Sequence, residues 1–372
     1  MKRSIIGVPK EIKAQEHRVA LTPSAAYQLI KNGHRVMVEK DAGAGSSFPT
    51  REYETAGCHI ALTAEEVFAE AEIISKVKEP QPSELPLLRE GQILFTYLHL
   101  AANRELTQQL LGTRCTAIAY ETIELNQRLP LLEPMSEIAG AMSVMVGAYH
   151  LAKHHGGRGI LLGGVPGVLP GKVIVLGGGT AGINAARVAT GLGADVTILE
   201  VDLERMRFLD ITMHTAHTLY SSEAGLMELL PQVDLIIGAV LVPGARAPKL
   251  ITREMLRRMP AGSVLVDIAV DQGGCAETTR PTTHAAPTYV EEEVIHYCVA
   301  NMPGAYSRTA TQALNNVTHR YLTLLADQGL EEACRLRPEI VKGINCHRGQ
   351  LTCAPVAEAH GLPYVEFVPR PR

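Results

Sequence analysis

Residues 172–202 read KVIVLGGGTAGINAARVATGLGADVTILEVD. The apolar, β-branched run at 173–176 predicts a buried parallel strand. A glycine-rich turn follows, and the small, helix-compatible segment 183–192 ends at a glycine that can cap a helix. A second apolar strand, 196–199, ends at an acidic residue. The stretch therefore predicts a complete βαβ unit.

The turn has the spacing Gly177-x-Gly179-x-x-Gly182, and each glycine has a physical role. Gly177 allows the tight turn, Gly179 lets the backbone approach a pyrophosphate, and Gly182 lets the helix pack closely on the strand. The helix N-terminus offers N–H groups and a partial positive charge to phosphates. Glu200 would accept hydrogen bonds from the adenosine ribose and repel a 2′-phosphate. We therefore expect NAD rather than NADP; the alternative is a simple glycine-rich turn.

Composition narrows the class of protein. The chain has 372 residues, enough for two domains, and a net charge of −4 that indicates no nucleic-acid-binding face. Its seven cysteines include no CxxC or zinc-ligand spacing, which favours reduced thiols and a cytoplasmic location. We expect no signal peptide and no membrane span. We also expect no metal site, because the pair His154-His155 cannot share one helical face.

The first third of the chain alternates strands with helices, which predicts a doubly wound α/β domain. A glycine-rich segment, 41–47, is interpreted as a surface turn. Expected strands are 4–8, 35–39, 73–77, 92–97 and 116–120, and expected helices are 22–33, 50–57, 63–71 and 103–111.

A long helix, 134–154, is expected to begin at Ser136 as its cap and to lead into the Rossmann stretch. Further strands are expected at 234–239, 263–268 and 296–299, then a helix at 309–328 and a tail of short elements from 338. We expect two doubly wound parallel-sheet domains. A Rossmann NAD-binding domain, 136–304, is inserted within a discontinuous substrate domain, 1–135 and 305–372, and the substrate binds in a cleft between them.

Ligands in such sheets bind beyond the carboxyl ends of the strands, where Arg18, Lys78, Glu79, His99 and Glu121 fall. An arginine fork grips a carboxylate at two points, and a lysine can hold a carboxylate or carbonyl oxygen as a point charge. The alternatives are structural. Arg18 could form a surface ion pair with a neighbouring glutamate, either Glu11 or Glu16, and Lys78 could be a solvated loop lysine beside Glu79.

Two residues could move protons. His99 directly follows an apolar strand, is expected to be partly buried, and has the pKa range of a proton carrier near neutrality. Its alternative is a structural histidine that donates to a backbone carbonyl. Asp271 follows the strand 263–268 and could act as a base or orient water; its alternative is an Asx-turn before Gly273-Gly274.

Several stretches together resemble the alanine dehydrogenase and transhydrogenase family over nearly the whole chain, in order. They are GVPKEIKAQEHRVALTP (7–23), KVKEP (76–80), LFTYLHLA (94–101), PLLEPMSEIAG (130–140), GGVPGVLPGKVIVLGGGTAGINAA (163–186), IGAVLVPGARAPKL (237–250), VLVDIAVDQGGCAETTRPTTH (264–284) and YCVANMPG (297–304).

The resemblance implies reversible oxidative deamination of L-alanine with NAD and water to pyruvate, ammonium and NADH. It implies that Arg18 and Lys78 bind the substrate, that His99 is the general acid/base with Asp271 as its partner, and that Met135 and Asn301 line the pocket. Besides the three glycines, the implied cofactor contacts are Ser136, Thr180, Glu200, Arg205, Ser221, Val240, Leu241, Ile268, Asp271, Arg280 and Met302. Family members are typically homohexamers.

The chain departs from the family in two places. Glu200 stands where many relatives carry aspartate. The segment 322–328 reads LTLLADQ, without the acid and histidine through which some relatives bind a metal, so we expect no metal.

Three other functions compete with this interpretation. The nearest is the NAD-binding component of a proton-translocating transhydrogenase, which would need a membrane partner and would have no use for His99 with Lys78. A saccharopine-type amino-acid dehydrogenase would need a wider pocket. A nucleotide-sensing module would bind NAD without turnover.

Overall fold

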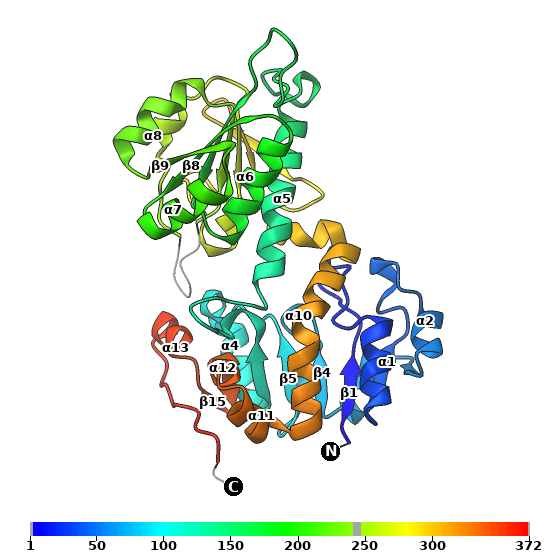
Figure 1. Cartoon of the computed structure of the whole chain (residues 1–372). Helices are drawn as coiled ribbons and strands as arrows, with labels where there is room; N and C mark the ends of the chain where they lie inside the picture. The colour runs from blue at the N-terminus through cyan, green and yellow to red at the C-terminus, as the bar shows by residue number, and fades with distance from the viewer. Residues whose placement is uncertain (1–2, 241–246, 371–372) are drawn as a thin grey trace. The chain divides into compact units, whose positions relative to one another are not determined.

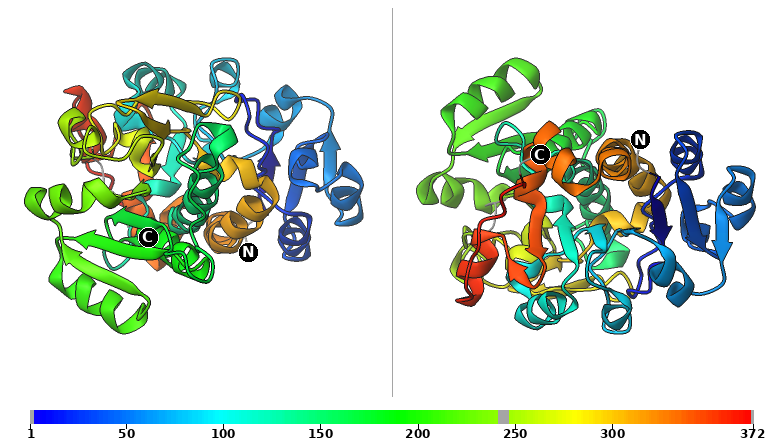
Figure 2. Two further views of the ribbon diagram at one scale, coloured as in Figure 1. Left: turned by 90° about the horizontal axis from the view of Figure 1, so that it is seen from above. Right: turned by 90° about the horizontal axis from the view of Figure 1, so that it is seen from below.

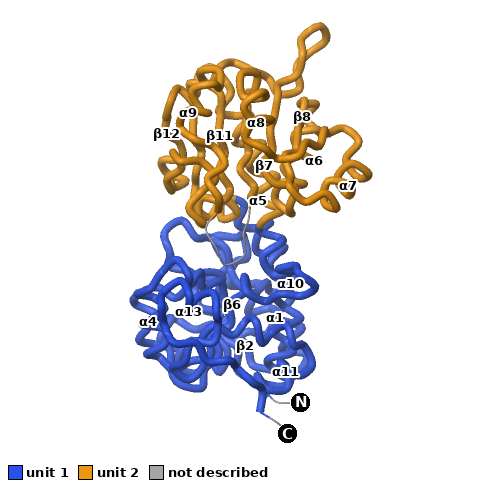
Figure 3. The backbone as a smooth tube through the Cα atoms, turned by 90° about the vertical axis from the view of Figure 1, so that its left-hand side faces the viewer, with its two compact units in different colours: residues 1–135, 306–372 blue, residues 136–305 orange. Residues whose placement is uncertain are grey.

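The computed structural model describes residues 3–240 and 247–370. The chain divides into two compact units, residues 1–135 with 306–372 and residues 136–305 (Figure 3). Each unit is built on its own mostly parallel sheet, with helices on both faces (Figures 1 and 2). The expectation of two α/β sheets is therefore confirmed.

The first unit contains an eight-stranded sheet in the order β15-β14-β6-β5-β4-β1-β2-β3. The six strands from β6 to β3 are parallel, and β14 and β15 are antiparallel to their neighbours. The strands are β1 (Ile5–Val8), β2 (Arg35–Glu39), β3 (His59–Ala61), β4 (Ile73–Ser75), β5 (Ile93–Thr96), β6 (Thr116–Ala119), β14 (Ile344–His347) and β15 (Gln350–Leu351).

Apolar side chains that alternate along these strands hold helices on both faces. Ile74, Leu94 and Ala117, on three neighbouring strands, pack with Phe68 of α3 and Leu110 of α4. On the other face α1 contacts β2, α12 contacts β6, and α10 contacts α1. The helices of this unit are α1 (Pro23–Lys31), α2 (Thr50–Thr55), α3 (Ala64–Glu70), α4 (Arg104–Thr113), α10 (Ser307–Gln328), α11 (Leu330–Leu336), α12 (Glu339–Gly343) and α13 (Ala354–His360).

Helix α10 joins the last part of the chain to the first. The Val19 N–H donates to Thr311 Oγ1 at 3.1 Å, and Thr22 Oγ1 donates to Asn315 Oδ1 at 2.6 Å. The glycine-rich segment expected to be a surface turn takes part in this packing. Its residue Ser46 is fully buried and hydrogen bonds to Thr311 Oγ1, so that prediction is wrong at Ser46.

The second unit contains a seven-stranded sheet in the order β12-β13-β11-β10-β7-β8-β9. All its pairs are parallel except β12 with β13. Chain order reverses between β7 and β10, which is the switch point where ligands of this fold bind. The strands are β7 (Lys172–Leu176), β8 (Asp195–Glu200), β9 (Ala216–Tyr220), β10 (Leu235–Gly238), β11 (Val264–Asp267), β12 (Thr288–Glu291) and β13 (Val294–Tyr297).

The helices of the second unit are α5 (Glu133–His150), which begins in the first unit, α6 (Thr180–Gly191), α7 (Leu203–Thr212), α8 (Glu223–Leu229) and α9 (Arg253–Leu256). The core is formed by buried residues of parallel strands, such as Val175 and Ile237, with Met142 of α5 and Ala186 of α6. The expected start of α5 at Pro134 agrees with the structure to within one residue, but its expected cap is wrong, and so is its expected end at His154, because the helix ends at His150. The helix begins at Glu133, so Ser136 lies inside its first turn and is not its cap.

Candidate active site

Three neighbouring strands of the first unit end in the predicted site residues. Lys78, His99 and Glu121 follow β4, β5 and β6, which lie side by side and run parallel. The loops after parallel strands emerge at one edge of a sheet. The fold therefore collects these three residues at the carboxyl edge.

Arg18 lies in the long loop after β1 and is only 2% exposed. Its Nε and Nη2 donate to Oε1 and Oε2 of Glu16 at 2.7 and 2.5 Å, a bidentate ion pair. The Nη1 atom lies 3.1 Å from Sδ of Met135. Arg18 therefore pairs with Glu16, as the alternative interpretation proposed, but the pair is buried and does not lie on the surface.

Glu16 keeps the guanidinium oriented. Burial raises the pKa of Glu16, but the hydrogen bonds and charge of Arg18 outweigh burial and lower this pKa to about 2. The carboxylate thus stays ionised and grips the Nε–Nη2 edge of the fork. The Nη1 atom, beside Met135, lies outside this bidentate pair.

Lys78 is buried, at 7% exposure, so it is not the solvated lysine of the alternative interpretation. Its carbonyl accepts a hydrogen bond from Thr96 Oγ1 at 2.8 Å. The neighbouring Glu79 pairs with Lys13, and the charge of Lys78 helps to lower the pKa of Glu16. The charge of Lys78 therefore acts on the same carboxylate that pairs with Arg18.

His99 has a backbone φ of 50°, in the left-handed region. Its N–H donates to Oε1 of Glu121 at 2.6 Å, and the Leu98 N–H donates to the same oxygen at 3.1 Å. The imidazole Nδ1 lies 4.0 Å from that oxygen, and the ring stacks on Tyr97 with centroids 5.8 Å apart. Glu121 is thus positioned to hold both the loop and a protonated ring.

The expected partial burial of His99 is wrong, because its side chain is 43% exposed. The strand before it is buried, but the left-handed turn at His99 directs the chain out of the sheet. An exposed imidazole beside a carboxylate can exchange protons with water or a substrate.

An aromatic cluster supports this loop. Tyr97 is buried, donates from its hydroxyl to the Leu131 carbonyl at 2.6 Å, and meets Tyr120 edge to face. Tyr120 in turn meets Phe95 edge to face, with centroids 4.5 Å apart. Aromatic pairs of this geometry contribute about 0.5–1.5 kcal/mol each to stability, so this packing holds the backbone before His99 in place.

The glycines of the second unit have the conformations that a dinucleotide turn requires. Gly177 has a φ of 93°. A Cβ at Gly182 would lie 1.9 Å from the Gly177 carbonyl oxygen, so only glycine allows α6 to pack this closely on β7. A Cβ at Gly179 would meet no heavy atom of the described residues within 4 Å. Protein packing therefore does not explain Gly179, whereas a pyrophosphate beside it would.

Glu200, at the end of β8, closes the glycine turn. Its Oε2 accepts a hydrogen bond from the Gly178 N–H at 2.8 Å, and its Oε1 accepts one from the Val201 N–H at 2.7 Å. Arg205 donates from Nε to the Gly178 carbonyl at 2.5 Å. The carboxylate is only partly buried.

The other predicted cofactor residues lie at the same end of the second sheet, after its strands, or on flanking elements. Arg280 stacks on Tyr289, with Cζ 3.8 Å from the ring centroid, and Leu241 lies outside the described residues. The remaining ones are Thr180 at the start of α6, Ser221 after β9, Val240 after β10, Ile268 after β11, Ser136 in α5 and Met302 in the short helix after β13.

Asp271 and Asn301 belong to the second unit. Asp271 is exposed in a short 3-10 helix after β11, and Asn301 has a φ of 65°, its carbonyl 3.3 Å from Nε2 of His284. The segment around the two glycines is stabilised by Asp267 instead, which accepts hydrogen bonds from the Ala269 N–H at 3.0 Å, before the glycines, and from the Cys275 N–H at 2.8 Å, directly after them. The structural role considered for Asp271 is thus performed by Asp267.

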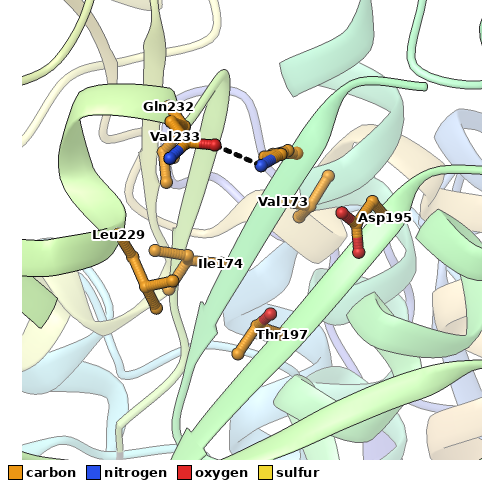
Figure 4. Close-up of a pocket in the computed structure, with 8 residues that line it drawn as sticks. Val173, Ile174, Asp195, Thr197, Leu229, Gln232 and Val233 are labelled. Atoms are coloured by element: carbon orange, nitrogen blue, oxygen red, sulfur yellow. Dashed lines mark hydrogen bonds between the residues drawn. The ribbon is translucent and has the colours of Figure 1, made fainter. Parts of the chain in front are cut away.

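A small hollow of about 100 Å³ lies at the opposite end of the second sheet (Figure 4). Val173 on β7, Asp195 and Thr197 on β8, and Gln232 line it. Val173, Asp195 and Thr197 lie in the first half of their strands, and Gln232 precedes β10. The hollow therefore lies away from the glycine turn and belongs to no predicted site.

Two kinds of feature are absent from the residues that the structure describes. Among residues 3–240 and 247–370, no cluster of three or more His, Cys, Asp or Glu side chains could hold a metal ion. No helix within the described ranges has the length and hydropathy of a membrane span.

Comparison with known domain families covers both units. Residues 7–139 match the N-terminal domain of alanine dehydrogenase/PNT, and residues 143–354 match its C-terminal domain. The chain belongs to the alanine dehydrogenase/PNT family. Membership of this family makes the chain an oxidoreductase and implies a nicotinamide cofactor.

Relatives of known name extend the match to nearly the whole chain. An alanine dehydrogenase of Halomonas elongata is 54% identical over 97% of this chain and 98% of its own length. A solved L-alanine dehydrogenase structure has a TM-score of 0.92 at 50% identity, covering 96% of this chain and 99% of its own. A transhydrogenase from Sinorhizobium meliloti has a TM-score of 0.80 at 27% identity, covering 94% and 99%. Within the alanine dehydrogenase/PNT family, this chain is therefore more similar to the dehydrogenases.

Proposed function

We propose that this chain catalyses the reversible, NAD-dependent oxidative deamination of L-alanine to pyruvate and ammonium. The observation that carries the proposal is the edge of the first sheet, where buried Arg18 and Lys78 accompany the exposed imidazole of His99. Two cations suit a small carboxylate substrate, and an accessible imidazole suits proton transfer. The 50% identity to a solved L-alanine dehydrogenase supports the same substrate.

In the proposed reaction Arg18 holds the substrate carboxylate, and Lys78 binds the oxygen that becomes the pyruvate carbonyl. NAD, when bound, supplies the acceptor for the hydride of the alanine Cα. His99 takes a proton from the water that adds to the resulting iminium, and then protonates the amine of the carbinolamine. As ammonia leaves, the hydroxyl gives its proton back to His99 and becomes the pyruvate carbonyl. Met135, beside Arg18, would line a pocket that needs room only for a methyl group.

We assign the roles of the two units from the same residues. Residues 1–135 and 305–372 would bind the substrate, and residues 136–304 would bind NAD. In the second unit Gly177, Gly179 and Gly182 would cradle the pyrophosphate, and Glu200 would bind the adenosine ribose. The open Cβ direction at Gly179 supports this role. Asp271 would assist His99 with water and ammonia, and Asn301 would contact the substrate.

A transhydrogenase component is the second candidate, because such a protein shares the fold at 27% identity. That reaction passes hydride between two nucleotides and needs no group to handle water or ammonia. The Glu121-supported His99 and buried Lys78 would then have no task. The two candidates thus differ in whether pyruvate and ammonium are consumed.

The deciding experiment measures NADH oxidation by the purified protein with pyruvate and ammonium, omitting each in turn, with NADPH in parallel. We expect oxidation that requires both compounds, yields L-alanine and is faster with NADH. Oxidation that needs neither, or NADH binding without turnover, would contradict the proposal and favour the second candidate. We also propose that the protein is a homohexamer and that it is located in the cytoplasm. Light scattering of the same sample tests the first, and cell fractionation tests the second.

A further inference from the structure

The loop that carries Lys78 rests on a buried cluster of three charges. Lys76 is 0% exposed, and its Nζ donates to Oε2 of Glu11 at 3.1 Å and to Oε1 of Glu84 at 2.7 Å. Both carboxylates are also buried. A charged group in such a place is costly unless it is paired, so the arrangement calls for a reason beyond packing.

Glu11 connects this cluster to the backbone of the loop. Its Oε1 accepts hydrogen bonds from the N–H groups of Val77 and Lys78, at 2.6 and 3.3 Å. Glu84 contacts the same ammonium but binds a different backbone group, the Gln81 N–H, at 2.7 Å. Glu11 is therefore the member that joins the buried charge to the residue expected to bind substrate.

The backbone of residues 76–78 is otherwise held by its neighbours. The Lys76 N–H donates to the Phe95 carbonyl, and the Lys76 carbonyl accepts from the Tyr120 hydroxyl. The Val77 carbonyl accepts from the Tyr97 N–H. The Lys78 carbonyl accepts from Thr96 Oγ1. Every backbone donor and acceptor of the three residues thus has a partner, and Glu11 supplies the acceptor for two of the three N–H groups.

At position 11, only a carboxylate can accept hydrogen bonds from both the Lys76 ammonium and the two backbone N–H groups. Lys76 presents donors to one oxygen, and the two backbone N–H groups present donors to the other. An amide in the same place would have to turn an N–H toward one of them, because it carries a single acceptor oxygen. Glutamine at position 11 would therefore either release the loop or oppose Lys76.

We propose that Glu11 is a positioning residue that fixes Lys78 for the substrate, with Lys76 holding the Glu11 carboxylate in place. This inference rests on the proposed function of Lys78 as a substrate-binding residue. It assigns to Glu11 an action through Lys78, without contact with the substrate itself.

The test compares Glu11→Gln with Glu84→Gln. Each removes one carboxylate from Lys76, but only the first changes the acceptor of the Val77 and Lys78 N–H groups. We expect Glu11→Gln to raise the KM for pyruvate about tenfold with an unchanged NADH dissociation constant. We expect Glu84→Gln to change the KM less than threefold. Equal effects of the two variants on KM would overturn the proposal and leave a cluster that serves stability alone.

A second readout does not depend on turnover. Hydrogen exchange measured by mass spectrometry on peptides covering 73–80 should quicken in Glu11→Gln and stay near wild type in Glu84→Gln. If wild-type protein does not consume pyruvate and ammonium, the proposed function fails, while this exchange still decides whether Glu11 holds the loop. Should Glu11→Gln not fold, Glu11→Asp replaces it, since it keeps the charge beside Lys76 with a carboxylate one methylene shorter. We expect this variant also to raise the KM for pyruvate and to quicken hydrogen exchange in residues 73–80.

Discussion

At the scale of single residues, His99 combines a left-handed backbone with an accessible ring. A φ of 50° costs a residue with a Cβ free energy, and the two N–H groups that donate to Glu121 help to offset it. The site thus maintains a strained backbone in order to present an imidazole at the edge of the sheet.

We predict that His99→Ala lowers kcat at least about a hundredfold, because it removes the group that moves the proton. The NADH dissociation constant should not change, since the glycine turn and Glu200 belong to the other unit. Steady-state kinetics and fluorescence titration measure the two quantities. His99→Asn is the control for backbone strain, since asparagine tolerates positive φ, and it should be equally inactive. Turnover near wild type in either variant would exclude His99 from proton transfer.

The Arg18–Glu16 pair predicts a pH dependence of stability. The pKa of Glu16 in the folded protein is about 2, below the value of 4.5 expected when unfolded, so the unfolded state takes up the proton first as pH falls. The stabilisation is present above about pH 4.5, is lost as pH falls toward 2, and amounts to roughly 3 kcal/mol. Urea unfolding should therefore show a gap between wild type and Glu16→Gln that narrows from pH 6 to pH 3. A gap independent of pH would disprove this titration.

Residue types and their positions in the sequence predicted that Arg18, Lys78 and His99 follow strands of one sheet, and the structure has them in the loops after β1, β4 and β5, while their roles stay predictions. What the sequence did not reveal is burial, because burial depends on the whole fold. Arg18 and Lys78 are more buried than loop residues usually are, whereas His99 is more exposed than predicted. Glu11 and Lys76 were not expected to matter jointly, since 65 residues separate them. The two lysines of KVKEP, Lys76 and Lys78, were a feature of the sequence that could have pointed to this buried cluster.

At the scale of secondary-structure elements, α6 shows how one glycine sets a helix-to-strand distance. We predict that Gly182→Ala destabilises the protein by at least about 1–3 kcal/mol and weakens NADH binding, because its Cβ would overlap the Gly177 carbonyl. Thermal unfolding and NADH titration measure these effects. Gly191→Ala in the same helix is the matched control. Its Cβ would meet no described atom within 4 Å, so the variant should be as stable as wild type or slightly more stable.

Long apolar runs predicted the central strands, and weakly apolar strands were missed. β3 has three residues, and β9, with the sequence AHTLY, is largely accessible at the sheet edge. β12 is likewise an edge strand with polar positions. β14, with the sequence INCH, lies in the tail and pairs with β6 across more than 200 residues. Local periodicity does not reveal such pairing, because the partner strand supplies the reason for the strand.

At the scale of the whole molecule, the second unit is one continuous stretch with its own core. We predict that residues 136–305 produced alone fold and bind NADH with an affinity close to that of the full chain. They should not consume pyruvate, because Arg18, Lys78 and His99 are absent. Circular dichroism, NADH fluorescence and the turnover assay check this. An unfolded fragment, or one that folds without binding NADH, would contradict the assignment of the cofactor to this unit.

The first unit is assembled from both ends of the chain, and this has a consequence for its synthesis. Helix α10, which contributes Leu314, Leu322 and Leu325 to the interior, is made only after the entire second unit. At ~5–20 residues per second, roughly 10–40 s pass between translation of the first 135 residues and completion of α10. During that interval the inserted unit can already fold, while the apolar face that α10 will cover stays open to solvent on the nascent chain.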